Sequence, residues 1–196
     1  MLENDYIRKL LAAIALDNDQ AAYKELFLLL HGKLKQFAYA ILKSGEEAEE
    51  LVSDLFIGIW QKKNQLSNIK TPLLYFYTTA KNLAINRLKK QKRRVSLSAE
   101  DWLVESNSIY FDPEQLMITE EMVRQIKKAV NDLPPRCRLI FKLIKEDGLK
   151  YKETAELLHL SVKTVEAQMA IALRRIAICL HFDMKKTPQP HFSFKK

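Results

Sequence analysis

GLKYKETAELLHLSVKTVEAQMAIALRRI, residues 148–176, is the stretch from which the rest of the chain is interpreted. The spacing of its apolar residues predicts one helix over 151–158, a turn at 159–160 and a second helix that Ser161 begins. A serine hydroxyl at this position accepts a hydrogen bond from a free N–H group in the first turn of a helix. The segment therefore predicts two short helices joined by a tight turn.

The second helix of this pair has two unlike faces. Apolar residues at helical spacing predict a buried stripe, formed by Val165, Met169, Ala172, Leu173, Ile176 and Leu180. The opposite face is small and partly basic, and it carries Lys163, Ala167, Ala170, Ile171 and Arg174, with Glu166 at its margin. Such a face fits the major groove of DNA. Taken alone, however, the segment is equally an ordinary helical hairpin with a solvated face.

Length and composition bound the remaining possibilities. The 196 residues suffice for one large or two small domains, and four glycines and six prolines argue against a loop-rich or all-β fold. A net charge of +8 and a pI of about 9.4 favour an acidic partner such as nucleic acid or a membrane surface. Cys137 and Cys179 lie too far apart for a metal or redox motif, which favours buried thiols in a reducing cytosol.

Several function classes have no support in the sequence. No segment approaches the ~20 apolar residues of a membrane span, and no basic N-terminal region leads into an apolar run. Glycine-rich phosphate loops, nucleophile elbows, catalytic carboxylate pairs and histidine clusters are also absent from the sequence. We therefore expect a cytoplasmic protein that is not an enzyme. We also expect it to have no cofactor and no bound metal, and not to insert into a membrane.

The first half of the chain predicts a succession of helices. Helical spacing covers 6–16, and Asp19 caps a following helix that Gly32 breaks or bends. Ser44 begins the next helix, with an acidic first turn that the helix dipole favours. A polar loop is expected at 63–70.

The helix that Ser44 begins runs to about residue 62 and is unusually apolar. Its apolar residues cover more than half of its circumference, and they are Leu51, Val52, Leu55, Phe56, Ile57, Ile59 and Trp60. A surface helix needs an apolar stripe of only roughly 100°. Either other helices surround this one, or one apolar flank, edged by Asp54, Gln61 and Lys62, is a protein-binding patch. We expect Asp54 to be an exposed charge whose reversal leaves folding intact.

The helix that Thr71 and Pro72 begin has a polar row and then a basic run. Helical spacing puts on one face Tyr75, Asn82, Asn86 and Lys89. The run at 81–94 has no acid, and its cations are Lys81, Arg87, Lys89, Lys90, Lys92, Arg93 and Arg94. Such a run is either a solubilising flank or, beside hydrogen-bonding side chains, a surface for a phosphate backbone.

Residues 95–121 reverse this charge, because they contain seven acids and no Lys or Arg. Helical periodicity is lost between 96 and 111 and resumes with a helix that Asp112 begins. We therefore predict an all-α protein with two small helical domains, at 1–94 and 112–185. A flexible acidic linker at 95–111 joins them, the second is a helix-turn-helix domain, and 186–196 is a loose tail.

Three stretches resemble, in this order, the motifs of one family. AEELVSDLFIGIWQKK resembles the polymerase-binding helix of the alternative sigma factors of bacterial RNA polymerase, in their extracytoplasmic-function (ECF) group. LYFYTTAKNLAINRLKKQKRR resembles the helix that opens and reads the minus-ten element. LPPRCRLIFKLIKEDGLKYKETAELLHLSVKTVEAQMAIALRRI resembles the fourth region, which reads the minus-thirty-five element. The resemblance covers about 18–94 and 112–180.

The resemblance implies a factor that binds core RNA polymerase, directs it to specific promoters, helps to open the DNA strands and is controlled by an anti-sigma factor. It places on the polymerase-docking element Leu51, Asp54, Leu55, Ile57, Trp60 and Gln61. At promoter DNA, duplex or melted, it places Tyr75, Asn82, Asn86, Arg87, Lys89, Lys90, Lys163, Thr164, Glu166, Ala167, Gln168, Ala170, Ile171 and Arg174. The loop 65–70 matches one proposed to hold a flipped base. One departure from the family is His159, which replaces a common small or glycine turn residue.

Two other hypotheses remain open from the residues alone. One is a stand-alone helix-turn-helix transcription regulator that binds an operator. The other is an RNA-binding accessory protein that uses the basic helix. The apolar helix at 46–62 discriminates among them, since a simple operator binder has no use for a flank that docks on polymerase.

Overall fold

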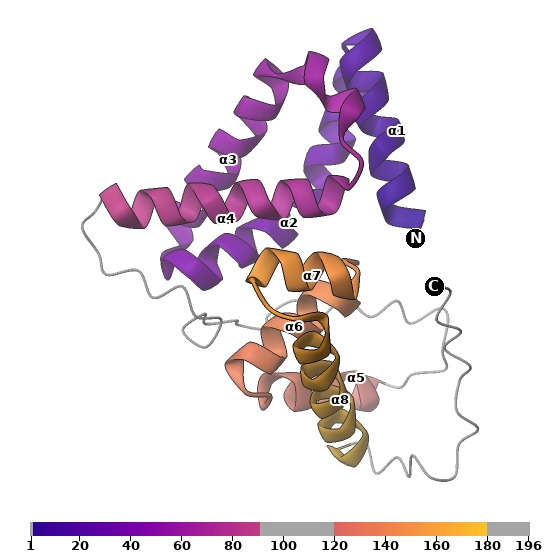
Figure 1. Cartoon of the computed structure of the whole chain (residues 1–196), viewed down its shortest axis with the longest axis vertical. Coiled ribbons are helices and arrows are strands. Elements are labelled where there is room, and N and C mark those ends of the chain that lie inside the picture. The colour runs from indigo at the N-terminus through magenta and orange to yellow at the C-terminus, as the bar shows by residue number, and fades with distance from the viewer. Residues whose placement is uncertain (1, 91–119, 180–196) are drawn as a thin grey trace.

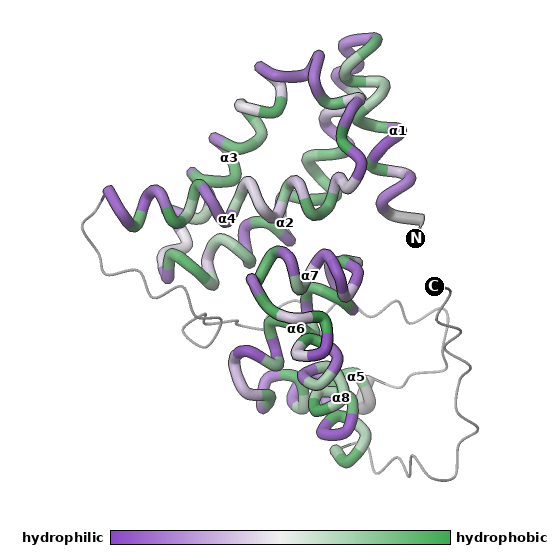
Figure 2. Tube along the Cα trace, in the orientation of Figure 1, coloured by the Kyte–Doolittle hydropathy of each residue, from purple (hydrophilic) through white to green (hydrophobic). Residues whose placement is uncertain are grey.

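The computed structural model describes residues 2–90 and 120–179, and the regular elements within these two ranges are all helical (Figure 1). Apolar and polar stretches alternate along the helices in Figure 2, as amphipathic helices packed around a core require. The all-α prediction is confirmed. No helix in the described ranges combines the length and the hydropathy needed to span a membrane.

The first domain consists of α1 (Leu2–Asp17), α2 (Gln20–Leu42), α3 (Gly45–Gln61), the 3-10 helix η1 (Lys63–Asn68) and α4 (Pro72–Lys90). Helix α2 packs against α1, α3 and α4, and its buried residues include Leu26, Leu30 and Leu34. The predicted helix starts are confirmed, because the Asp19 carboxylate accepts from the N–H groups of Ala21 and Ala22 and the Ser44 hydroxyl from that of Glu47.

Two local predictions for this domain are wrong. Gly32 lies within an unbroken α2, because buried leucines on either side hold the helix in place and a glycine costs only about 1 kcal/mol there. The expected loop at 63–70 contains η1, which the buried side chain of Leu66 anchors. The predicted start of α4 agrees with the structure, and its first turn has a further partner in α1, because Asn4 Oδ1 accepts from the Leu73 N–H at 3.2 Å.

The second domain consists of α5 (Glu120–Asn131), α6 (Pro135–Lys145), α7 (Tyr151–Leu158) and α8 (Val162–Cys179). Helices α5, α6 and α7 all pack against α8. The predicted helix pair is confirmed: α7 ends at His159, which has a left-handed φ of 54°, and the Ser161 hydroxyl accepts from the Thr164 N–H at 3.0 Å.

The predicted inner stripe of α8 is confirmed at three positions, is half-buried at Ile176 and is wrong at Leu173. Val165, Met169 and Ala172 are buried, whereas Leu173 is 39% exposed. Ala177, which the stripe did not include, is buried instead. The reason is the 3.6-residue period: Ala172 and Leu173 are adjacent, so a helix packed along Val165 and Met169 turns Leu173 outward.

Some predictions fall outside the described residues. These are the acidic linker at 95–111, the helix start at Asp112, the basic residues after Lys90, Leu180 and the tail at 186–196.

The two domains contact each other through α4 and α7, and their buried residues join into one cluster. Figure 1 shows α7 lying below α4 and α2, at the top of the second domain.

Candidate functional site

The exposed flank of α3 is the first candidate surface. Of the six residues expected to dock on polymerase, Asp54, Ile57 and Gln61 are exposed, and the Ile57 side chain is 54% accessible. Leu51 and Leu55 are buried and belong to the core. Trp60 is half-buried: its ring packs edge-on against Tyr23, and the Lys63 ammonium lies 4.4 Å from its centroid. Most of this apolar helix therefore lies in the core, and one flank faces solvent.

Polar contacts to α2 fix the orientation of α3. The Tyr23 hydroxyl donates to the Phe56 carbonyl at 2.9 Å. The Glu49 carboxylate pairs with Lys35 at 2.6 Å and with His31 at 2.7 Å. These two contacts, that with Lys35 first, lower the pKa of Glu49. Because this side of α3 is held against α2, the flank with Asp54 and Ile57 faces away from it.

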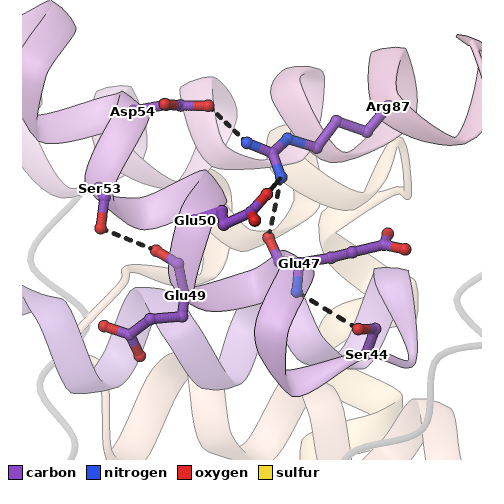
Figure 3. Close-up of polar contacts among 7 residues, drawn as sticks. All are labelled: Ser44, Glu47, Glu49, Glu50, Ser53, Asp54 and Arg87. Carbon is purple, nitrogen blue, oxygen red and sulfur yellow. Dashed lines mark hydrogen bonds and ion pairs between the residues drawn. The ribbon is translucent and has the colours of Figure 1, made fainter.

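Arg87 of α4 ties α3 to α4 (Figure 3). Its guanidinium reaches Asp54 at 2.5 Å and Glu50 at 3.1 Å, and it donates to the Glu47 carbonyl at 3.2 Å. Asp54 is exposed, as expected, but it is paired, so its reversal would place a cation beside Arg87. Arg87 was also expected at DNA, but its side chain points toward the acids of α3.

The polar row of α4 lies where the sequence places it. Asn82, Asn86, Lys89 and Lys90 are exposed, and Tyr75 is half-buried at the start of the row. An asparagine amide both donates and accepts, which suits it to the edge of an unpaired base. The structure thus assembles two free amides next to two free cations on one helix face.

The segment 65–70, expected to hold a flipped base, is anchored at both ends. The Leu66 side chain is buried, and the Lys70 carbonyl accepts from Arg8 Nη2 at 2.8 Å. Ser67 and Asn68 lie exposed between these anchors, and the exposed Gln65 precedes the first of them.

The outer face of α8 is open. Exposed on it are Lys163, Glu166, Ala167, Ala170, Ile171 and Arg174. The other two residues expected at DNA, Thr164 and Gln168, are half-buried, and the Thr164 hydroxyl contacts that of Ser161 at 2.8 Å. The face carries two cations and one acid, with small or apolar side chains between them. This combination fits a DNA groove better than a catalytic pocket.

Sequence reasoning missed one buried polar contact. Lys81 belongs to the basic run of α4, yet it is only 6% exposed. Its ammonium donates to the Leu157 carbonyl at 2.7 Å and lies 3.0 Å from His159 Nε2. Burial lowers the pKa of Lys81. No local pattern could reveal this contact, because its partners lie 76 and 78 residues along the chain.

The described part of the chain contains no group of three or more His, Cys, Asp or Glu residues able to hold a metal ion. Cys137 is buried, and its thiol contacts the Gln168 carbonyl at 3.2 Å. Cys179 is half-buried, and its thiol lies 3.8 Å from the Gln125 carbonyl.

Two family models match this chain. The model described as Sigma-70 region 2 matches residues 26–94, and that described as Sigma-70, region 4 matches residues 123–176. The first range contains the α3 flank and the polar row of α4, and the second contains the helix pair α7–α8.

Curated relatives match most of the chain. The ECF RNA polymerase sigma factor SigW of Bacillus subtilis is 26% identical over 158 residues, which are 77% of this chain and 84% of the relative. The ECF RNA polymerase sigma-E factor of Escherichia coli K12 is also 26% identical over 158 residues, 82% of its own length. Among solved structures, CnrH in complex with the cytosolic domain of CnrY is similar in fold, with a TM-score of 0.50 and 19% identity over 90% of this chain and 97% of CnrH.

Proposed function

This chain belongs to the extracytoplasmic-function group of sigma factors, and from this premise we propose how its residues direct RNA polymerase to promoters and start transcription. One observation supports the function above all others. Regions 2 and 4 occur in one chain, in the family's order and with a spacer between them. A stand-alone helix-turn-helix regulator would need only the second.

The first role is docking on core polymerase through the flank of α3. Asp54, Ile57 and Gln61 form its exposed part, and the half-buried Trp60 supports it from the α2 side. Leu51 and Leu55 act indirectly, because they hold α3 in the core rather than touch a partner. What supports this role is that Ile57 is 54% exposed beside the charge of Asp54.

The second role is recognition of promoter DNA at two places. On α4, Asn82 and Asn86 read the separated strand, Tyr75 borders the row, and Lys89 and Lys90 contact phosphates. On α8, the exposed outer face enters the major groove of the minus-thirty-five element. The exposed acid Glu166 can accept from a cytosine amino group there.

The factor acts in the cytoplasm, has no catalytic residue of its own and takes no cofactor. An anti-sigma factor controls it, and this partner binds the free chain in place of polymerase. CnrH, similar in fold, is itself found in complex with the cytosolic domain of CnrY.

Transcription with purified components tests the function. Core polymerase from the same organism is incubated with genomic DNA, with and without the chain, and the 5′ ends of the transcripts are sequenced. We expect initiation at a limited set of sites that depends on the chain. A chain that binds duplex operators by itself but neither binds core polymerase nor starts transcripts would be a regulator instead.

A further inference from the structure

We propose that Lys81 and His159 form a latch that holds the helix-turn-helix domain against α4 in the free chain. The latch joins the helix that carries the polar row to the turn between α7 and α8. We further infer, resting on the proposed function, that it must open before the factor can occupy both promoter elements.

The first support is the geometry around Lys81. Its ammonium has three donors and no acceptor, and two of the donors meet Leu157 O at 2.7 Å and His159 Nε2 at 3.0 Å. Leu157 O lies in the last turn of α7, where helix carbonyls carry a partial negative charge that attracts a cation. A lysine that is only 6% exposed needs such partners, because burying an ammonium without them is costly.

The second support is His159 itself. It occupies a left-handed position, φ 54°, that glycine adopts more readily than other residues. The imidazole contributes to the contact with α4, because Nε2 of the neutral ring can accept from Lys81. The departure from a small turn residue therefore has a physical reason: it joins the helix-turn-helix motif to the other domain.

The third support is a second polar contact between the domains. Lys142 of α6, itself 5% exposed, donates to Gln36 of α2 at 3.3 Å. Beside it, Asp147 of the second domain lies close to Tyr77 of α4, and burial raises the pKa of Asp147 to about 7. Residues of both domains line one small cavity there, among them Lys33 and Phe37 of α2 and Leu143 and Glu146. This second patch shows that the two domains meet over a continuous surface, along which Lys81 and His159 form the contact between α4 and the turn after α7.

Docking conflicts with the spacing of the promoter elements. The minus-ten and minus-thirty-five elements are about 25 base pairs apart, or about 85 Å along straight DNA at 3.4 Å per base pair. In the docked chain α4 contacts α7, which is joined to α8 by a turn of three residues at 159–161. A domain of this size has a radius of gyration of only about 11–12 Å. The two reading faces therefore cannot reach both elements until the domains separate.

Small-angle X-ray scattering of the full chain tests the latch. Lys81→Met keeps the apolar stem and removes the ammonium, and His159→Gly removes the ring from a position where glycine is unstrained. We expect a compact wild type and an increase in radius of gyration of roughly 3 Å or more in both variants. Helical content by circular dichroism should not change. Lys152→Met, an exposed lysine of α7, is the matched control and should stay compact.

Two scattering results would overturn the latch. One is a wild type already as extended as the variants, and the other is a pair of variants as compact as the wild type. Binding of His159→Gly to core polymerase separates this inference from the proposed function. If the latch variants extend but neither they nor the wild type bind polymerase, the latch stands and the sigma-factor function fails. If scattering is unchanged while polymerase binding is normal, only the latch fails.

Discussion

The exposed faces of α4 and α8, which we propose read DNA, offer it different groups. On α4 the cations nearest the asparagines are already engaged, because Arg87 pairs with two acids of α3 and Lys81 is buried against the second domain. What α4 leaves open is amides, with Lys89 and Lys90 beyond them. On α8 the whole outer face is open, including Lys163 and Arg174, and only its inner stripe is packed.

This difference leads us to expect different kinds of DNA contact from the two helices. Amides held on a fixed helix can distinguish the edges of unpaired bases but attract DNA weakly from a distance. An open face with two cations and small side chains can slide into a groove and gain affinity from phosphates and shape. We therefore expect α4 to matter after the strands separate and α8 to matter before.

The largest expected effect separates the two faces of α8. Met169 is 1% exposed, so Met169→Ala should lower the free energy of unfolding of the second domain by about 2–5 kcal/mol. Ile171, which is 41% exposed on the outer face, is the matched control, and Ile171→Ala should change it by at most about 0.5 kcal/mol. Urea unfolding measures both. Similar losses in the two variants would mean that the outer face of α8 is not free.

The sequence predicted these local features well because their causes are local. Asp19, Ser44 and Ser161 cap helices through N–H groups two or three residues away, and a 3.6-residue period sorts most of α8 into faces. Leu173 shows the limit of this reasoning, since a period leaves residues at the edge of a stripe undecided.

Contacts distant in the chain could not be predicted from the same patterns. The basic run in the sequence predicts one continuous charged surface. In the structure, however, Arg87 pairs with acids 33 and 37 residues away, and Lys81 donates to a carbonyl 76 residues away. Only the packing of α3 and α7 against α4 decides which cations remain free. For the same reason the pairing of Asp54 with Arg87 could not be predicted.

The next effect sets α4 directly against α8. Asn82→Ala should leave polymerase binding and the closed complex intact and weaken the open complex by roughly 1–3 kcal/mol, the scale of one good base contact. Lys163→Ala should instead weaken the closed complex on duplex DNA and matter less on a template already melted around the start site. Permanganate footprinting of unpaired thymines, beside gel shifts on both templates, measures each step. Normal melting by Asn82→Ala would reduce Asn82 to a solvated amide.

A charge on the flank of α3 tests whether that surface is separate from both DNA faces. Ile57→Glu should weaken binding to core polymerase about tenfold, or about 1.4 kcal/mol, because an exposed apolar side chain at an interface is replaced by a carboxylate. Leu16, the most exposed large apolar residue of α1 at 75%, gives the control Leu16→Glu, which should bind normally. Fluorescence anisotropy with labelled chain measures both affinities. Equal losses would point to a general effect of added negative charge and not to docking at α3.

The smallest effect compares an engaged cation of α4 with a free one. Arg87 is ion-paired to Glu50 and Asp54 on a partly exposed surface, so Arg87→Ala should lower the free energy of unfolding by about 0.5–1 kcal/mol. Because its guanidinium already has anionic partners, the salt dependence of holoenzyme binding to a pre-melted template should not change. Lys89 is exposed on the same helix, and Lys89→Ala should leave stability alone but reduce the slope of log K against log salt by about one. If Arg87→Ala reduces that slope as much as Lys89→Ala does, the guanidinium leaves its acids in the complex. The α3–α4 ion pairs would then belong to the free chain only, and α4 would meet DNA with all its cations, as α8 does.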